Sequence, residues 1–301
     1  MTSGFCQACA ERVEHQDRYC EKCGAWVPDL RRDRVELDVG VAAGVSDRGL
    51  RHHRNEDALA LREVCQEPAD RGVAVAIVCD GVSSSACPEQ ASEIAAEVAA
   101  NTLVAALRAE DGPATATREA IHAAGKAVAG LAPSDLDGAD HTAPACTVVS
   151  AVVTLDTVTV GWVGDSRAYW IPQGGTGVAP TRLTRDDSWL AQVVAAGTLT
   201  PAQAAADRRA HAITAWLGED ADQLNPHVVT IEPKGPGVVV MCTDGLWNYL
   251  DSVEDLAAAL PARALKAPLD AARSLVEIAL RCGGRDNITV AVLPFVRGGP
   301  S

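Results

Sequence analysis

The stretch VAVAIVCDGVSSS, residues 73–85, is an unbroken apolar run that stops at an aspartate and a glycine. Two further segments repeat the pattern: VTVGWVGDSRAYW at residues 158–170 and VVVMCTDGLWNYL at residues 238–250. A continuous valine-rich run bounded by turn residues is typical of a buried β-strand. The repetition predicts several buried strands that each end at a carboxylate, and the function of the chain depends on why they do.

Length and composition limit the kind of protein. The 301 residues allow one large domain with a small appendage. The chain has 26 basic and 40 acidic residues, a net charge of −14, and no long basic run, which argues against nucleic acid as a partner. Its apolar runs are shorter than the roughly 20 residues that span a bilayer, and its N-terminus lacks the pattern of a signal peptide. We therefore expect no membrane span and a cytoplasmic location.

The ten cysteines fall into two groups. Cys6, Cys9, Cys20 and Cys23 form two C-x-x-C pairs, a spacing that suits four thiolates around one structural Zn²⁺. Residues 1–27 are therefore predicted to be a small zinc-ribbon-like segment, and residues 28–36 a linker. A disordered tail or a redox-active C-x-x-C pair is the weaker alternative. The other six cysteines are interpreted as buried, reduced thiols: Cys65, Cys79, Cys87, Cys146, Cys242 and Cys282.

The main domain, residues 37–296, combines groups of strands and helices, and residues 297–301 form a short tail. Segments 37–47 and 57–64 are expected to be an initial pair of strands around a loop. Further strands are expected at 73–79, on both sides of Asp156, at 167–171, and in the segments 227–233, 237–245 and 286–295. Helices are expected within 88–110, 116–132 and 271–284, and short helical pieces within 188–218, where Thr200 and Gln203 have capping-box spacing. Strands joined by tight turns predict an α+β domain with helices packed on antiparallel sheet.

Four aspartates lie at strand boundaries: Asp80, Asp165 and Asp244 follow apolar runs, and Asp286 precedes one. Strand ends are rigid, so carboxylates placed there can converge without the entropy cost of ordering a loop. Carboxylates gathered without a cation would repel one another, and oxygen ligands of this kind favour Mg²⁺ or Mn²⁺. The alternative is that the DG and DN pairs only make turns. That alternative suits any one aspartate, but four at strand boundaries favour a metal site.

The ordered motifs RNEDA, VCDGVSSS, VGDSRAYW, LTRDDSW, CTDGLW and GRDNITV are similar to those of the metal-dependent protein serine/threonine phosphatases of the 2C type. This resemblance covers roughly residues 37–295. It implies a four-layer sandwich of two antiparallel β-sheets flanked by helices. It also implies hydrolysis of phosphoserine and phosphothreonine by water activated at a binuclear Mn²⁺ or Mg²⁺ centre. The implied partners are phosphorylated proteins and a cognate bacterial Ser/Thr kinase.

The resemblance also assigns roles to residues. Asp80 would bridge the two ions, Gly81 would offer its carbonyl to one, and Asp244 and Asp286 would ligate the other. Asp165 matches an aspartate that binds a third, weaker ion. The remaining implied site residues are Glu56 and Asp57, which would hold metal-bound waters, and Asn287, which would orient its neighbour. Residues 187–217 match the flap that borders the site and influences substrate access.

The chain departs from the family pattern at three places, one of which is the sequence ACT, ending at Thr147, where the family normally has a glycine before the threonines. His52 occupies the position of an arginine that binds the substrate phosphate, so Arg51, His52 and Arg54 are all candidates for that role. The glycine-rich continuation after DG is replaced by VSSS. The general acid is left open among His52, His53 and Glu56. An alternative function is a catalytically weak scaffold that binds phosphoproteins and uses the zinc ribbon as an adaptor.

Overall fold

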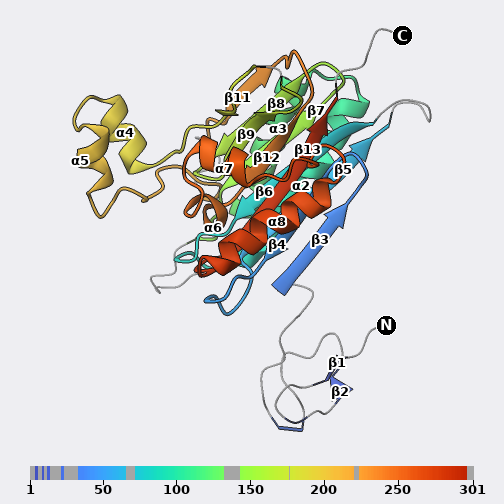
Figure 1. The fold of residues 1–301 in the computed structure, drawn as a ribbon. Coiled ribbons are helices and arrows are strands. Elements are labelled where there is room, and N and C mark those ends of the chain that lie inside the picture. Colours follow the sequence, from blue (N-terminus) through green and yellow to red (C-terminus); the bar gives the residue numbers. More distant parts are fainter. Residues whose placement is uncertain are drawn as a thin grey trace.

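The computed structural model describes residues 4–5, 9, 12–13, 22–23, 33–65, 72–131, 143–175, 177–219 and 224–296. This part of the chain is built on two large antiparallel β-sheets (Figure 1). The six-stranded sheet has the order β10 (Thr181–Arg182), β9 (Arg167–Pro172), β12 (Gly237–Cys242), β13 (Ile288–Phe295), β4 (Ala43–Asp47) and β3 (Arg34–Asp38). The five-stranded sheet has the order β11 (His227–Ile231), β8 (Val158–Val163), β7 (Val148–Val153), β6 (Val73–Asp80) and β5 (Asp57–Val64).

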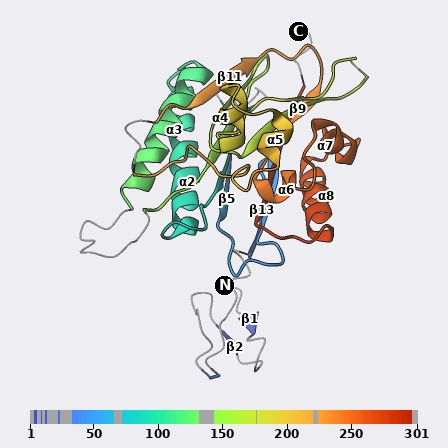
Figure 2. The same cartoon turned by 90° about the vertical axis from the view of Figure 1, so that its left-hand side faces the viewer.

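Helices cover the outer faces of both sheets, as Figure 2 shows. The five-stranded sheet carries α2 (Pro88–Arg108) and α3 (Pro113–Ala129). The six-stranded sheet carries α6 (Asp244–Trp247), α7 (Val253–Ala259) and α8 (Pro268–Arg281). The predicted α+β sandwich of two antiparallel sheets between helical layers is confirmed.

The order of layers explains the continuous apolar runs. The two sheets pack face to face through side chains such as Val78 and Val149 on one sheet and Met241 and Ala291 on the other. The opposite faces of the same strands pack against helices. Every residue of β7, β8, β12 and β13 is therefore buried. A strand covered on both faces shows no alternation between apolar and polar residues.

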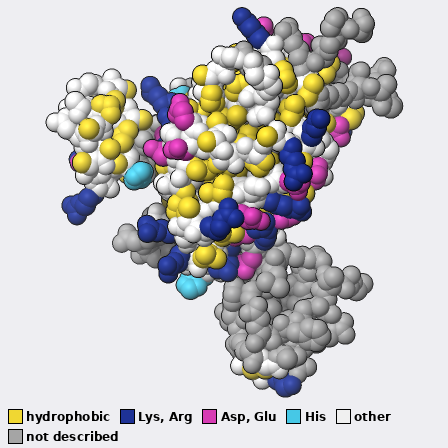
Figure 3. Space-filling model, viewed as in Figure 1, with side chains coloured by type: hydrophobic (Ala, Val, Ile, Leu, Met, Phe, Trp, Pro, Cys, Tyr) yellow, Lys and Arg dark blue, Asp and Glu magenta, His cyan; other side chains and the backbone are white. Residues whose placement is uncertain are grey.

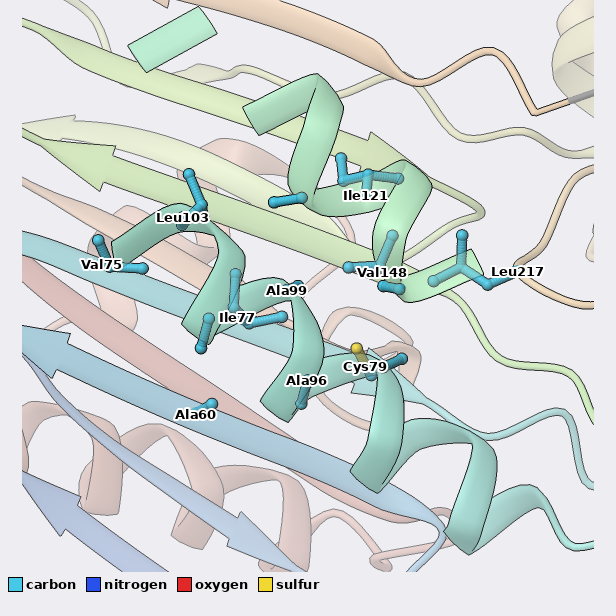
Figure 4. Packing of buried hydrophobic residues seen from close by; sticks show 14 of the residues in the cluster. Ala60, Val75, Ile77, Cys79, Ala96, Ala99, Leu103, Ile121, Val148 and Leu217 are labelled. Carbon is cyan, nitrogen blue, oxygen red and sulfur yellow. The ribbon is translucent and has the colours of Figure 1, made fainter. Parts of the chain in front are cut away.

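Helix α2 shows how sequence produces one of these contacts. Pro88 occupies the first helical turn, where its missing N–H costs nothing, and alanines predominate on the buried face. Ala96 and Ala99 let the helix approach the sheet closely, and Leu103 fills the space beside Val75 (Figure 4). Small side chains on the helix and valines on the strands together make this layer compact.

The structure corrects the expected first pair of strands. Residues 37–47 are not one strand, because the chain turns at Gly40, whose φ is +79° and whose N–H donates to Asp38 Oδ1 at 2.9 Å. Strands β3 and β4 pair with each other in the six-stranded sheet, whereas β5 belongs to the other sheet. Because β3 begins at Arg34, the last residues of the expected linker are part of the sheet.

Two other expectations have different outcomes. The six scattered cysteines are all without disulfides, but only Cys79, Cys146 and Cys242 are buried, so the expectation of burial was wrong for Cys65, Cys87 and Cys282.

The zinc-ribbon prediction depends on Cys6 and Cys20, which lie outside the described residues. Near them, β1 (Gly4–Phe5) pairs antiparallel with β2 (Arg12–Val13). Among the described residues, no helix has both the length and the apolar character that a bilayer crossing requires.

Replacing Leu103 with alanine should lower the free energy of unfolding by about 3 kcal/mol, because the side chain is fully buried between α2 and the sheet. Denaturant unfolding followed by circular dichroism measures this change. The control is Leu155→Ala, since Leu155 is 46% exposed and its loss should change stability by less than about 0.5 kcal/mol. Equal destabilisation by the two variants would contradict the described packing.

Candidate metal centre

Five aspartates from both sheets gather at one end of the sandwich. Asp57 and Asp80 are direct partners across the β5–β6 pair. Asp244 follows β12 and Asp286 precedes β13, and these two strands are neighbours in the other sheet. Asp165 lies in the connection from β8 to β9, where the chain passes from one sheet to the other. The aspartates predicted from strand boundaries therefore come together, and they do so where the two sheets meet.

Burial and mutual repulsion disfavour the charged form of these carboxylates. Burial, followed by the charges of the other four aspartates, raises the pKa of Asp80 well above its ordinary value. The pKa of Asp244 is also raised well above its ordinary value, first by burial and then by Asp286. Burial raises the pKa of Asp57 to about 7, and burial together with Asp186 raises that of Asp165 to about 6. The site thus holds more negative charge than its own residues can neutralise.

The Asp57 carboxylate is held through one of its two oxygens, and the other oxygen has no hydrogen-bond partner. Its Oδ2 accepts hydrogen bonds from the hydroxyls of Thr243 at 2.9 Å and Thr289 at 2.7 Å. Behind them, Ser46 Oγ lies 2.7 Å from Thr289 Oγ1 and accepts from Asn55 Nδ2 at 2.8 Å. Asp57 Oδ1 is buried and has no hydrogen-bond partner. A buried, unpaired carboxylate oxygen of this kind suits a cation or a cation-bound water.

Gly81 occupies a position that admits no side chain. A Cβ there would lie 2.6 Å from the Pro88 carbonyl oxygen and 2.7 Å from that of Glu56. Glycine is required because the backbone runs this close to its neighbours directly after Asp80. That the Gly81 carbonyl faces the centre stays a prediction.

Asn287 connects the end of the centre near β13 with the loop that precedes β5. Its side-chain Nδ2 donates to the carbonyls of Arg48 at 2.8 Å and Arg54 at 3.1 Å, and its Oδ1 accepts from the Glu56 N–H at 2.7 Å. Its own N–H donates to Asp286 Oδ1 at 2.8 Å. Asn287 therefore holds the loop of residues 48–56 in place as well as contacting its neighbour.

The three phosphate-binding candidates have different surroundings. Residues 50–56 form a loop, so directions expected from strand alternation do not apply there. His52 Nε2 lies 3.1 Å from Asp286 Oδ1. Arg54 forms ion pairs with Glu56 at 3.0 Å and Glu89 at 3.3 Å. Arg51 is exposed, and no described residue pairs with its guanidinium.

The flap, residues 187–217, forms a lobe that stands beside the end of the sandwich (Figures 1 and 3). It contains α4 (Trp189–Ala195) and α5 (Pro201–Ala205), and the capping box predicted at Thr200 and Gln203 is confirmed. Asp187 anchors its base by accepting from the Gly164 N–H at 3.0 Å, and it also pairs with His227 at 2.9 Å.

A pocket of about 430 Å³ lies between the flap and the body. Leu190, Ala205 and His211 contribute from the flap, and Asp165 and Asn248 from the body. Because Asp165 belongs to the aspartate cluster, and Asn248 donates to Asp244 Oδ2 at 3.2 Å, the pocket borders the candidate centre. In Figure 3, acidic side chains gather on the body where the flap joins it.

Arg167 lines this pocket, and the sequence did not indicate it as a site residue. It is bound by Asp186 through two nitrogens and by Asp251 at 3.0 Å, and its guanidinium lies 3.7 Å above the Trp247 ring. Thr243 and Thr289 were missed as well. Their signal was present in the sequence, because each lies within three residues of a strand-boundary aspartate, on the TDG and DNIT motifs.

The donor set fits divalent cations held in part through water. In the described part of the chain, no three carboxylate, imidazole or thiolate groups are placed so that they could hold a metal ion by themselves. Mg²⁺ and Mn²⁺ retain waters and accept backbone carbonyls, so the aspartates would hold such ions in part through water. The unpaired Asp57 Oδ1 and the crowded charges of Asp80 and Asp244 are the observations that call for a cation.

Comparison with known proteins agrees with this geometry. A family model described as protein phosphatase 2C matches residues 50–277. The serine/threonine protein phosphatase PstP of Mycobacterium tuberculosis is 30% identical over 272 residues, which are 87% of this chain and 46% of that protein. The chain thus spans about half the length of this relative.

Solved structures show the same fold. The serine/threonine phosphatase of S. agalactiae is 25% identical, with a TM-score of 0.65, over 87% of this chain and 98% of that one. The catalytic domain of the serine/threonine protein phosphatase PstP, determined in complex with two manganese ions, is also 25% identical. Its TM-score is 0.59, over 87% of this chain and 99% of that one.

The metal-free protein should lose stability as the pH rises from about 4 to about 7. The pKa of Asp57 is raised from 3.8 to about 7, so the folded state binds its proton more tightly than the unfolded state does. That contribution is complete below pH 4, is lost as the pH passes 7, and is of the order of 4 kcal/mol for Asp57 alone. Melting temperatures measured in chelator across this range test it.

Manganese should reduce this pH dependence, because a bound cation takes over the role of the proton. The same melting series with excess Mn²⁺ is the comparison. A metal-free melting temperature that rises steadily from pH 4 to pH 7 would contradict the described crowding of buried carboxylates.

Proposed function

Because the chain belongs to the protein phosphatase 2C family, we propose that it is a metal-dependent protein phosphatase that hydrolyses phosphoserine and phosphothreonine. The observation that carries the proposal is the group of five aspartates at the junction of the two sheets, with Asp57 and Asp80 in register. The relatives are phosphatases, which favours hydrolysis over the phosphoprotein-binding scaffold.

The residues of this chain would have distinct roles in this reaction. Asp80 and the Gly81 carbonyl, with Asp244 and Asp286, would hold two Mn²⁺ or Mg²⁺ ions, and Asp165 a third, weaker one. Bound there, the ions would polarise the phosphate ester and lower the pKa of the attacking water. Asp57 Oδ1 would accept a hydrogen bond from water, because Thr243 and Thr289 already occupy its other oxygen.

Substrate phosphate would be bound by Arg51. Of the three candidates, Arg54 is committed to two glutamates and His52 faces Asp286, whereas Arg51 is exposed at the same loop. A guanidinium suits a phosphate because it donates two parallel hydrogen bonds.

We further propose that the substrates are phosphoproteins of a cytoplasmic Ser/Thr kinase, and that the pocket between flap and body takes residues beside the phosphorylated one.

Asp80→Asn should lower turnover of para-nitrophenyl phosphate by at least about 100-fold in Mn²⁺, because it removes a carboxylate charge that would hold the ions. Wild-type turnover should also vanish in chelator. The matched control, Asp156→Asn in the exposed β7–β8 turn, should keep wild-type activity. The metal-free melting temperature of Asp80→Asn should not fall, since a buried like charge is removed. Activity that survives in Asp80→Asn would contradict the proposed centre.

His211→Ala should raise KM for a phosphothreonine peptide about fivefold and leave kcat/KM for para-nitrophenyl phosphate within about twofold. The reason is that His211 lines the pocket from the flap, where residues beside the phosphorylated one would lie, and para-nitrophenyl phosphate has no such residues. His122→Ala on α3, which does not line the pocket, is the control. Equal effects on both substrates would argue against a peptide-binding role of the pocket.

A further inference from the structure

Glu56 is held on its backbone by the elements that carry the candidate centre. Its N–H donates to Asn287 Oδ1 at 2.7 Å. Its carbonyl accepts from the Gly81 N–H at 3.1 Å and from Ser92 Oγ at 2.5 Å. The backbone of Glu56 is thus fixed against the start of β13, the end of β6 and the first turns of α2.

The carboxylate of Glu56 is held as well, by one donor on each oxygen. Arg54 Nε donates to Oε1 at 3.0 Å, and Ser83 Oγ donates to Oε2 at 2.6 Å. The second distance is in the range of charge-assisted O–H···O⁻ bonds, which are stronger than bonds between neutral groups. The Glu56 side chain is only 8% exposed, so its carboxylate depends mainly on these two donors.

The two donors are not equivalent. Arg54 is shared with Glu89, and its side chain is 55% exposed, so its guanidinium has a second partner and contact with solvent. Ser83 is the donor to Oε2, and it follows Gly81 by two residues on the same loop. Ser83 belongs to the VSSS segment that stands in place of the glycine-rich sequence of the resembled family. A glycine there has no hydroxyl to donate.

We infer that Ser83 is a positioning residue that fixes the Glu56 carboxylate, and through it the metal centre next to Gly81. The inference rests on the proposed function. A carboxylate held by two donors keeps one orientation toward a bound ion or its water, whereas one held only on Oε1 can turn about its terminal torsion. Loss of such outer hydrogen bonds typically weakens metal binding by about 10- to 100-fold.

Ser83→Ala tests this directly, because Ser83 is exposed and its truncation leaves no cavity. We expect the Kd of Mn²⁺, measured without substrate from the electron paramagnetic resonance signal of the free ion, to rise about 10-fold. Ser83→Thr, which keeps the hydroxyl, and Ser84→Ala, the adjacent exposed serine, should bind Mn²⁺ like the wild type. The metal-free melting temperature should be unchanged in all three.

Kinetics provide the second readout. The turnover of para-nitrophenyl phosphate by Ser83→Ala should be reduced at limiting Mn²⁺ and should recover toward the wild-type value as Mn²⁺ is raised. Unchanged Mn²⁺ affinity in Ser83→Ala, with wild-type protein that binds the ion normally, would overturn this inference and leave the proposed function standing. An equal loss in Ser84→Ala would also overturn it, by assigning the effect to the loop. Wild-type protein that binds no Mn²⁺ would overturn both.

Discussion

The burial of like charges at the junction of the two sheets is the constraint on which the rest of this structure depends. Five aspartates converge there, and burial together with their mutual repulsion raises the pKa of Asp57, Asp80, Asp165 and Asp244. Such a cluster costs stability unless protons or cations neutralise it. The surrounding sandwich, with its apolar layers, supplies the stability that tolerates this cost. The same aspartates that a cation site would require therefore lower the stability of the metal-free fold.

A continuous polar network keeps the aspartates in place. Thr243 directly follows β12 and Thr289 lies in the neighbouring strand β13 of the six-stranded sheet, yet both donate to Asp57 on the other sheet. Asn287 makes a similar connection to the loop before β5. The hydrogen bonds of the centre thus also dock one sheet against the other. A change in how the sheets pack would alter the centre, even if every aspartate were retained.

Much of this arrangement could be predicted from the sequence, for identifiable physical reasons. Valine-rich runs ending at Asp80 and Asp244 marked both the buried strands and the site, because strands covered on both faces lack alternation. The first strands were misread, because Gly40 turns the chain inside a segment that is mostly apolar. The contacts of Thr289 with Asp57 and of Ser83 with Glu56 depend on which strands become neighbours. That pairing is a property of the topology, and local sequence does not contain it.

The position of β13 has a consequence for the order in which the protein can mature. This strand is the last along the described chain, yet it lies in the middle of its sheet, between β12 and β4. During synthesis β4 therefore lacks its neighbour β13 until that strand has been made. The two strands are far apart in the sequence, as the separation of Ser46 and Thr289 by 243 positions shows. Until then the sheet has a gap and Asp57 lacks the Thr289 hydroxyl. A nascent chain cannot assemble the centre early, so the aspartate cluster and its hydrogen bonds are complete only after nearly all of this domain has been synthesised.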